Sequence, residues 1–406
     1  MTRPEASHTN DWTGRVVFAC PRIPELGGGG TATEAITRAL IQRGVDVSHV
    51  TVNPGIRPSL VPTLTVFEMG DAHRTPSFRG TRGARSRARG AVTAFLKRRD
   101  RRRGLRRLRR LVDALGPRDV VVFTNVLPKI ILDESGYRRS ESSPIFIGQH
   151  HSTFHGAGSE WERGPKMRHF DDIDLFLALT DEDAELFQTV VDAPCSSVPN
   201  IAPSMEHSRH RPGHNVVALA RYEREKRLDV MIETFAAATR HQHRDWQLHI
   251  YGDGSLRSQL EGQIRQLNID DRVRLMGPTD DVEEVMSTAA LNLLTSEFEG
   301  FPMSVLEASA MGVPTIAFDC SPGIRALVSH ESGALVAPGD LAAFSVELGR
   351  LIADDQLRER LGSAARHVAA TYSSDVVVDR WLTYIHECDR RRRESVRLDT
   401  GTGASS

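Results

Sequence analysis

Short apolar runs alternate with helical stretches along this chain, and the alternation occurs twice. The first run, RVVFAC at 15–20, is followed by a loop rich in Pro and Gly, by a stretch with apolar residues at helical spacing (31–44), and by a second apolar run at 45–52. Runs of this length are typical of strands buried in a parallel sheet. The order strand, loop, helix, strand therefore predicts open α/β sheets.

The alternation divides the chain into two halves, and a polar stretch rich in Pro, His and Arg (203–214) is interpreted as the linker. In the first half, further strands are expected at 119–125, 144–150 and 174–180. In the second half, strands are expected at 215–220, 246–252, 273–277, 290–296, 314–320 and 333–338, with helices at 228–240, 255–268, 282–289 and 303–312. Because 406 residues exceed one hydrophobic core, we expect two α/β domains with a ligand cleft at the carboxyl ends of their strands.

The cysteines and the apolar runs bear on the compartment. Four scattered cysteines (Cys20, Cys195, Cys320 and Cys388) form no C-x-x-C pair, which argues against a disulfide framework or a zinc site and favours a reducing compartment. The first apolar run is far too short for a signal peptide or a membrane span, and no later run approaches ~18 apolar residues. We therefore expect a cytoplasmic protein.

Two carboxylates stand eight residues apart in the stretch EFEGFPMSVLEASAMG at 297–312. Pro302 suits the first turn of a helix, so Glu299 falls in the preceding loop and Glu307 falls within the helix. The free N–H groups from Phe301 to Ser304 then form an anion-binding helix end. The two acids could accept hydrogen bonds from sugar hydroxyls, or they could simply favour the positive end of the helix dipole.

Two cations follow the first expected strand of the second half. Arg221 and Lys226 come directly after the run at 215–220 and before the next helix. Cations at this position could clamp a diphosphate together with an anion-binding helix end. The alternative is that both are solvated surface charges.

Glycines and histidines occupy strand ends in the first half. Glycines 27–30 precede a helix, and glycine there permits close approach of a ligand. The match of this loop to G-x-G-x-x-A is weak, because the loop is long and the following strand ends in Asn53 without an acid for a ribose. His150, His151 and His155 share one loop without the spacing of a helical zinc site. Such a histidine could position an acceptor hydroxyl or could satisfy the loop backbone.

Several segments together resemble the retaining glycosyltransferases of family 4, which have the GT-B fold. The similar segments are the glycine-rich loop, helix and strand at 24–52, the Pro-Asn turn VPNIAP at 198–203, the Arg…Glu-Lys segment at 219–235, the G-x-G helix and base-binding turn at 250–282, and the Glu-x7-Glu signature at 296–328. The resemblance spans about 15–385, and the last segment is its most specific part. It implies an α/β GT-B architecture, in which two Rossmann-like domains face each other across a cleft.

The domain boundaries follow from this architecture. We expect an acceptor-binding domain over 13–202 and a donor-binding domain over 203–371. A helix at about 372–390 is expected to pack back on the first domain, and 391–406 are expected to form a disordered tail.

The resemblance also implies roles for the candidate residues. Glu307 would hold the ribose of a nucleotide-sugar donor, and Glu299 would bind the donor sugar or stabilise the transition state. His151, with His150 as the alternative, would face the donor sugar. Retention of anomeric configuration is likewise implied by the family alone.

The leaving diphosphate has its own expected ligands. Arg221 and Lys226 would neutralise it, so no metal ion is expected, and no cofactor beyond the nucleotide-sugar co-substrate. The other expected substrate contacts are Gly28, Gly29, Gly277 beside the nucleobase, Phe301, Met303 and Ser304.

A strongly basic segment lies in the first half, although the whole chain carries a net charge of −1. Residues 79–110 contain fifteen Arg or Lys and one acid, Asp100, with apolar residues at helical spacing. We expect two short amphipathic helices divided near Gly104. Their basic faces could bind an anionic membrane at up to ~1 kcal/mol per cation, or could remain solvated while the leucines pack inward. Nucleic-acid binding is disfavoured, because only Phe95 interleaves the cations.

The sequence thus predicts a hexosyltransferase that uses a nucleotide-diphosphate sugar, in particular a UDP-sugar. The expected acceptor is an unknown hydroxyl compound of the cell envelope, a polysaccharide or a lipid-linked molecule, which would place the enzyme at the inner face of the plasma membrane. Alternatives are a secondary-metabolite acceptor and a non-catalytic protein that binds membranes or polyanions. An epimerase or phosphorylase of the same fold is disfavoured by the Glu-x7-Glu signature.

Overall fold

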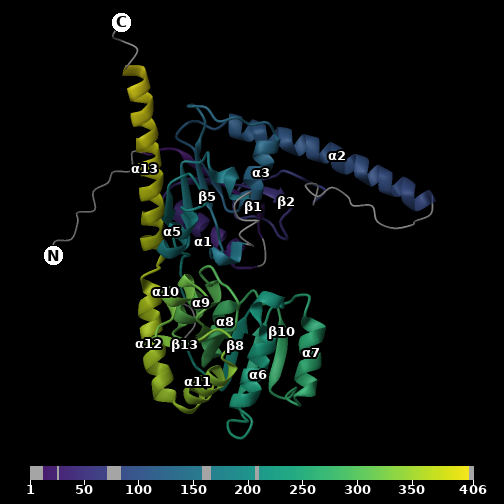
Figure 1. Cartoon of the computed structure of the whole chain (residues 1–406), viewed down its shortest axis with the longest axis vertical. Coiled ribbons are helices and arrows are strands. Elements are labelled where there is room, and N and C mark those ends of the chain that lie inside the picture. The colour runs from purple at the N-terminus through teal and green to yellow at the C-terminus, as the bar shows by residue number, and fades with distance from the viewer. Residues whose placement is uncertain (1–11, 25–26, 71–83, 158–165, 206–209, 402–406) are drawn as a thin grey trace, which may run out of the picture.

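The computed structural model contains two α/β domains, as the sequence predicts (Figure 1), and residues of both domains line one cavity. The structure describes residues 12–24, 27–70, 84–157, 166–205 and 210–401. Residues 79–83 of the basic segment, 206–209 of the expected linker and 402–406 of the expected tail lie outside this part.

The first domain is built on a parallel sheet with the strand order β3-β2-β1-β4-β5-β6-β7. Its strands are β1 (Arg15–Arg22), β2 (Asp46–Asn53), β3 (Thr63–Thr65), β4 (Val120–Phe123), β5 (Ile145–Gln149), β6 (Leu175–Ala178) and β7 (Cys195–Ser197). Its helices are α1 (Gly28–Gln42), α2 (Ala84–Asp113), α3 (Val126–Glu134) and α5 (Asp181–Phe187), with 3-10 turns η1 (His155–Ala157) and η2 (Arg168–Phe170). The central strands β4 and β5 are wholly buried and β1 is largely buried, as expected from their apolar runs, whereas the edge strands β3 and β7 are short and only partly buried.

The second domain has a parallel sheet with the order β10-β9-β8-β11-β12-β13. Its strands are β8 (Asn215–Leu219), β9 (Gln247–Tyr251), β10 (Val273–Gly277), β11 (Leu291–Leu294), β12 (Thr315–Phe318) and β13 (Gly333–Val336). Its helices are η3 (Arg224–Lys226), α6 (Leu228–Ala238), α7 (Arg257–Gln266), α8 (Val282–Thr288), α9 (Met303–Met311), α10 (Pro322–Leu327), α11 (Leu341–Ala353) and α12 (Asp355–Ala370). In both sheets the strand order reverses beside the first strand, between β1 and β4 and between β8 and β11, and ligand crevices form at such points.

The last helix, α13 (Ser374–Gly401), returns to the first domain (Figure 1). Trp381 is buried and meets Phe18 of β1 edge-to-face, with 6.1 Å between ring centroids. Arg43 binds Asp375 at 2.9 Å and Asp379 at 2.7 Å, which ties the end of α1 to α13. Helices α1 and α13 therefore cover one face of the first sheet, while α2, α3 and α5 cover the other.

Two expectations about helices are wrong. The basic segment forms one continuous helix, α2, and not two helices divided near Gly104. Gly104 allows close packing there, since a Cβ at this position would lie 2.4 Å from the Val66 carbonyl oxygen. The expected disordered tail is helical up to Gly401, because α13 continues past residue 391. Among the helices of the described part, none is long and apolar enough to cross a bilayer.

Candidate active site

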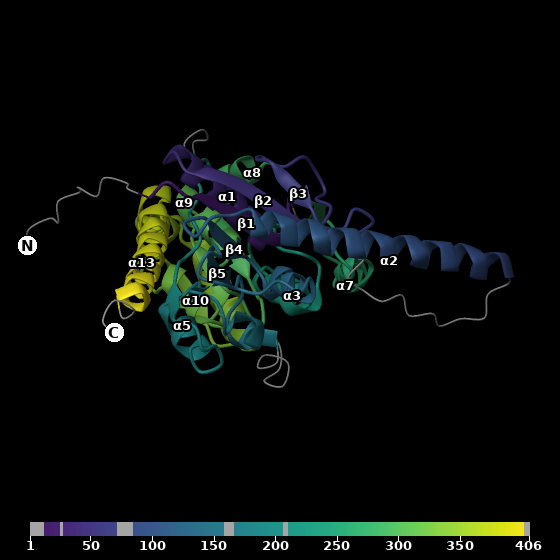
Figure 2. The same ribbon diagram turned by 90° about the horizontal axis from the view of Figure 1, so that it is seen from above.

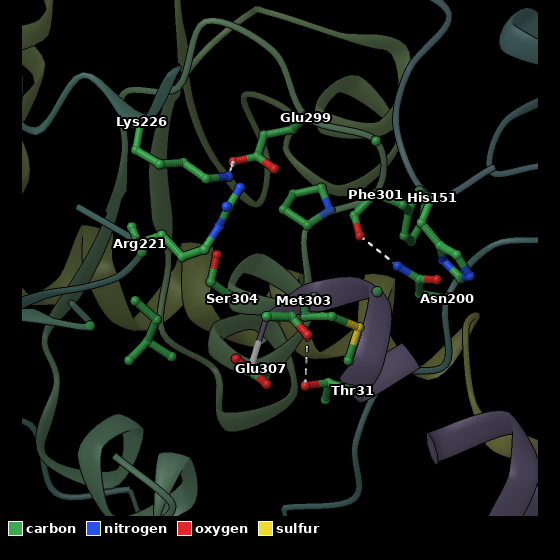
Figure 3. A pocket seen from close by; sticks show the side chains of 18 of the residues that line it. Thr31, His151, Asn200, Arg221, Lys226, Glu299, Phe301, Met303, Ser304 and Glu307 are labelled. Atoms are coloured by element: carbon green, nitrogen blue, oxygen red, sulfur yellow. Dashed lines mark hydrogen bonds and ion pairs between the residues drawn. The ribbon is translucent and has the colours of Figure 1, made fainter. Parts of the chain in front are cut away.

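A cavity of about 550 Å³ lies between the two domains and is lined by both. From the first domain come the start of α1, the loop after β5 and the turn after β7; from the second come the segments that follow β8, β9, β10 and β11. These are the carboxyl ends of parallel strands, where ligands of open α/β sheets bind. Figure 3 shows how the side chains converge on the cavity.

The reversal of strand order brings the predicted cations beside the predicted loop carboxylate. Lys226 follows β8 and Glu299 follows β11, and the two strands are neighbours. The Nζ of Lys226 lies 2.6 Å from Oε1 of Glu299, and Ser296 Oγ donates to the same oxygen at 2.7 Å (Figure 3). Both side chains are largely buried, at 17% and 12% exposure, so this ion pair is well shielded from solvent.

Backbone contacts fasten the two segments together. Thr295 Oγ1 donates to the carbonyl oxygens of Lys226 and Arg227, at 3.0 Å each. The N–H of Glu297 donates to the carbonyl of Glu225 at 2.8 Å. The position of Lys226 relative to the cavity is therefore fixed by main-chain contacts as well as by its ion pair. Glu297 makes this bridge through its backbone N–H, and its side chain forms a 3.5 Å ion pair with Arg227 outside the cavity lining.

Arg221 also lines the cavity, but its environment is more open. Its Nη2 lies 2.8 Å from Oε1 of Glu225, and 59% of its side chain is exposed. Its long, exposed side chain can exchange Glu225 for a ligand anion at little cost, because ion pairs near the surface are worth about 0–1 kcal/mol.

Helix α9 begins at the cavity wall. Pro302 is its N-cap residue, one position earlier than the first turn that the sequence predicts. The first helical hydrogen bonds are donated by Val305 and Leu306 to the Pro302 carbonyl, so the N–H groups of Met303 and Ser304 project from the helix end. With the dipole of the helix they form an anion-binding end at the cavity.

The loop before α9 is held by the first domain. Asn200 Nδ2 donates to the Phe301 carbonyl at 2.7 Å (Figure 3). Gly300 lies against the histidine loop, where a Cβ would be 2.8 Å from the His151 carbonyl oxygen. The shape of this loop therefore depends on contacts across the domain boundary.

Glu307 points into the cavity from α9, away from Glu299 (Figure 3). No hydrogen bond or ion pair joins its carboxylate to another residue in the part of the chain that the structure describes. Burial raises the pKa of Glu307 from the ordinary 4.5 to about 7. A carboxylate of this kind gains most from a ligand that donates hydroxyl groups to it.

The structure distinguishes between the candidate histidines. His151 lines the cavity, whereas His150 turns to the core and meets Phe187 edge-on at 5.4 Å between centroids. Both ring nitrogens of His151 are buried and accept or donate no hydrogen bond within the described chain. Burial, and then the neighbouring His150, lower the pKa of His151 to about 4, so its ring is neutral at physiological pH. His155 is exposed, in η1, and packs against Phe154.

The predicted glycines are placed differently from one another. Gly28 and Gly29 line the cavity at the start of α1, next to Met303 and His151. Gly277 ends β10 and accepts a hydrogen bond from the Gly252 N–H at 2.9 Å, and it is the following residues, Pro278 and Thr279, that line the cavity.

Sequence reasoning missed several lining residues. Ser152, Asn200, Tyr251, Asp253, Thr279 and Val282 also contribute to the cavity wall. The positions of Tyr251 at the end of β9 and of Thr279 just after β10 were available as signals, since both follow expected strands.

Two facing parallel sheets with an anion-binding cleft at their carboxyl ends define the GT-B fold, which is the fold of many glycosyltransferases. Residues 206–368 match the family of glycosyl transferases group 1. The match covers the second domain, which holds the lysine–glutamate pair, α9 and Glu307.

The chain is similar to curated proteins of surface-glycan synthesis. It is 31% identical over 263 residues to an exopolysaccharide phosphotransferase of Streptomyces coelicolor. This alignment covers 63% of this chain and 28% of the relative. It is 28% identical over 251 residues to the lipopolysaccharide 1,6-galactosyltransferase of Escherichia coli. This alignment covers 58% of this chain and 66% of the relative. The chain thus spans between about a quarter and two thirds of the length of such relatives.

Solved structures share the fold over nearly the whole chain. A point mutant of S. aureus TarM, in complex with fondaparinux, alpha-GlcNAc-glycerol and UDP, superimposes with a TM-score of 0.71 at 13% identity, covering 91% of this chain and 99% of TarM. Anabaena HepE in complex with UDP and glucose has a TM-score of 0.70 at 15% identity, covering 92% and 100%. At these identities the likeness establishes the fold alone.

Proposed function

We propose that this protein is a retaining glycosyltransferase of family 4 that transfers a hexosyl unit from a UDP-sugar to a hydroxyl group of a cell-envelope, polysaccharide or lipid-linked acceptor. The observation that carries the proposal is the convergence of Lys226, Glu299, Glu307 and the start of α9 on one cavity, opposite His151 of the other domain. In this assignment 203–371 bind the donor and 13–202 bind the acceptor.

The donor diphosphate would lie against the start of α9. The N–H groups of Met303 and Ser304 and the helix dipole favour an anion there. Lys226, which stays shared with Glu299, and Arg221, which can leave Glu225, would then contact the phosphates and stabilise the charge that develops as the sugar–phosphate bond breaks. The nucleoside would extend toward Glu307, whose unpaired carboxylate can accept both ribose hydroxyls, with the base near Tyr251 and Thr279.

The donor sugar would lie between Glu299 and His151. Glu299 has one carboxylate oxygen engaged by Lys226 and Ser296 and the other available for sugar hydroxyls. His151 is neutral and carries two unsatisfied buried ring nitrogens, so it can hydrogen-bond the sugar or the acceptor without adding charge. Retention at the anomeric carbon rests on the family resemblance, and NMR of the product linkage tests it.

The site would work without a metal ion. Two cationic side chains and a helix end already face the position proposed for the diphosphate, and the described residues contain no group of three or more His, Cys, Asp or Glu able to hold a metal. We expect transfer activity to withstand EDTA. Loss of activity that is restored by Mg²⁺ or Mn²⁺ would contradict this part of the proposal.

Names of similar proteins support the choice of substrates. UDP is present in the complexes of TarM and HepE, and the E. coli relative is a lipopolysaccharide galactosyltransferase. A small secondary metabolite is the second candidate acceptor. Competition between the two acceptor classes in a radiolabelled-sugar assay separates them.

The decisive experiment combines a donor screen with a matched pair of variants. Nucleotide-sugars should raise the melting temperature by mass action, and the one that binds should also be hydrolysed slowly or transferred. Glu299→Gln should lower turnover by about 10²–10³, the range seen when one group that stabilises the transition state is lost. Glu297→Gln, two residues away and outside the cavity lining, should stay near wild type. Full transfer by the Glu299 variant would refute its role, and no response to any nucleotide-sugar would favour a non-catalytic binding protein.

A further inference from the structure

Helix α2 stands out from the first domain. It is 30 residues long, and its N-terminal half projects well beyond the body of the molecule in both views (Figure 1 and Figure 2). A helix that leaves the domain it belongs to exposes a large surface, and the glycosyl-transfer site makes no use of it, because no residue of α2 lines the cavity.

The other half of α2 is firmly attached. Leu108 and Val112 are buried in the core beneath the sheet. Asp100 is buried and accepts a hydrogen bond from the Met69 N–H at 2.9 Å, and Gly104 packs against the carbonyl of Val66. The projecting half therefore holds a fixed direction relative to the first domain.

The outward face of α2 is a stripe of uncompensated arginines. It consists of Arg98, Arg99, Arg102, Arg103, Arg106 and Arg110, which are all exposed and have no ion pair with any residue that the structure describes. Other arginines of the helix do find acids: Arg101 binds Glu134 at 2.7 Å, and Arg107 binds Glu68. The protein thus neutralises the flanks of α2 and leaves its outward face fully cationic.

Two apolar side chains accompany the arginine stripe. Phe95 is 63% exposed and Leu96 is 42% exposed, in the projecting half of the helix. At 100° per residue, Phe95 falls between Arg102 and Arg106 on the helix circumference, so the ring lies within the cationic face. Most of the Phe95 ring is therefore presented to solvent among arginines, and the ring belongs to none of the hydrophobic clusters of the described residues.

We propose that α2 docks the first domain onto an anionic phospholipid bilayer. The arginines would bind lipid phosphates, and Phe95 and Leu96 would enter the boundary between headgroups and acyl chains, as in helices that lie in the membrane interface. The inference goes beyond the proposed transfer reaction and does not depend on it, although a surface-bound enzyme would meet a lipid-linked acceptor directly. A soluble polyanion would match the charge but would leave the apolar side chains without a function.

Flotation of the full chain with phospholipid vesicles tests the proposal. The protein should float with vesicles that contain phosphatidylglycerol and phosphatidylcholine in equal parts, should not float with phosphatidylcholine alone, and should be released by salt. The triple variant Arg99→Glu/Arg102→Glu/Arg106→Glu should bind the anionic vesicles at least about a hundredfold more weakly, since each cation contributes several-fold.

A matched control separates location from net charge. Arg265→Glu/Arg360→Glu/Arg380→Glu changes the net charge equally at exposed positions outside α2, and it should float like the wild type. Equal loss in both triple variants, or equal binding of the wild type to neutral vesicles, would overturn the proposal.

Two further measurements complete the test. Phe95→Ser keeps every charge and should weaken vesicle binding by about tenfold, in line with loss of most of one buried phenyl ring; unchanged binding would eliminate the inserted role of the ring. Thermal stabilisation by UDP reports folding and the donor site in all variants. Vesicle binding without thermal stabilisation by UDP would refute the transferase proposal alone. Thermal stabilisation by UDP without vesicle binding would refute the docking proposal alone. Stronger binding to dextran sulfate than to anionic vesicles would assign α2 to soluble polyanions instead.

Discussion

Replacing Glu307 with glutamine should make the protein more stable and at the same time impair its site. Glutamine keeps the shape of the side chain but removes the charge that α9 holds in the cavity wall. The wild-type carboxylate has no partner among the described residues, and burial raises its pKa to about 7. The variant therefore isolates the cost of keeping a charge ready for a ligand.

The magnitude follows from the pKa difference between the folded and unfolded chain. A tenfold change in proton affinity corresponds to about 1.4 kcal/mol, so a rise from 4.5 to about 7 amounts to roughly 3 kcal/mol. Because the carboxyl pKa is raised in the folded state, the folded chain holds more protons than the unfolded chain between these values, and the free energy of unfolding falls as the pH rises through this range. This free-energy difference is an upper limit, because the Glu307 side chain borders the cavity.

Unfolding experiments over a range of pH provide the assay. At pH 4 the protonated glutamate and the glutamine should give equal free energies of unfolding. Above about pH 7.5 Glu307→Gln should be more stable by up to roughly 3 kcal/mol, seen as a melting temperature higher by about 2–4 °C per kcal/mol. Glu359→Gln, at an exposed position of α12, serves as the control and should show no such divergence.

A difference in the free energy of unfolding that does not change with pH would refute this reasoning. If Glu307→Gln and the wild type differ by the same amount at pH 4 and pH 8, the carboxylate is not held at a raised pKa, and the charge costs nothing. Equal stabilisation by Glu359→Gln would attribute the effect to net charge instead of to the cavity.

Nucleotide binding offers a second readout of the same carboxylate. Hydroxyl groups that donate to a carboxylate favour its charged form, so a bound ribose should lower the pKa of Glu307 and UDP affinity should rise as the pH increases through 7. Calorimetry in buffers of different ionisation enthalpy should then detect proton release on UDP binding. Glu307→Gln should remove the share of the proton release that comes from this carboxylate, leaving only the share that comes from the nucleotide phosphates. Identical proton release in both proteins would contradict the ribose assignment.

Three further predictions test contacts of the site and of α2. In a double-mutant cycle of unfolding, Lys226→Met and Glu299→Gln should couple by about 0.5–3 kcal/mol, because the two groups form one shielded ion pair; strictly additive effects would exclude this. Asn200→Ala should cost about 1–3 kcal/mol of stability and raise the KM for the donor more than it lowers kcat, since the loop before α9 loses its anchor; an unchanged KM would show that the loop holds its shape alone. Gly104→Ala should destabilise by about 1–3 kcal/mol, because its Cβ would lie 2.4 Å from a backbone oxygen, whereas Gly262→Ala, with nothing within 4 Å, should stabilise by up to ~1 kcal/mol. Equal effects of the two alanines on chemical unfolding would show that α2 does not pack closely at Gly104.

The fold was predictable because its signals are local. The central buried strands are short apolar runs in the sequence, and several helices carry a capping residue at one end, such as Thr180 before α5 and Gly312 after α9. The interpretation of α2 failed for the opposite reason. The prediction of a helix break at Gly104 is wrong because this glycine is required by the carbonyl of Val66, 38 residues earlier, and no local pattern reveals that contact.

The site shows the same division. Its residues could be proposed from their position after strands, and the lysine and arginine were found in this way. The pairing of Lys226 with Glu299 could not be predicted, since these residues lie 73 positions apart and are brought together only by the neighbouring placement of β8 and β11. The choice between His150 and His151 also required the structure, because adjacent residues of one loop differ only in the direction of their side chains.

The polar groups of the cavity fall into two kinds, and the difference bears on how a donor would bind. Lys226 and Glu299 satisfy each other, so a diphosphate must share the lysine with the glutamate, and the net gain is only the difference between two ion pairs. Glu307 and His151 have no hydrogen-bond partner in the described part of the chain, so a ligand that satisfies them offsets much of the cost of their burial. Binding energy should therefore come mainly from the nucleoside and sugar, whereas the lysine can act chiefly when negative charge develops on the leaving phosphate. Truncating the donor from UDP to uridine should accordingly weaken binding less than removing its ribose hydroxyls, and the opposite order in calorimetry would show that the phosphates dominate.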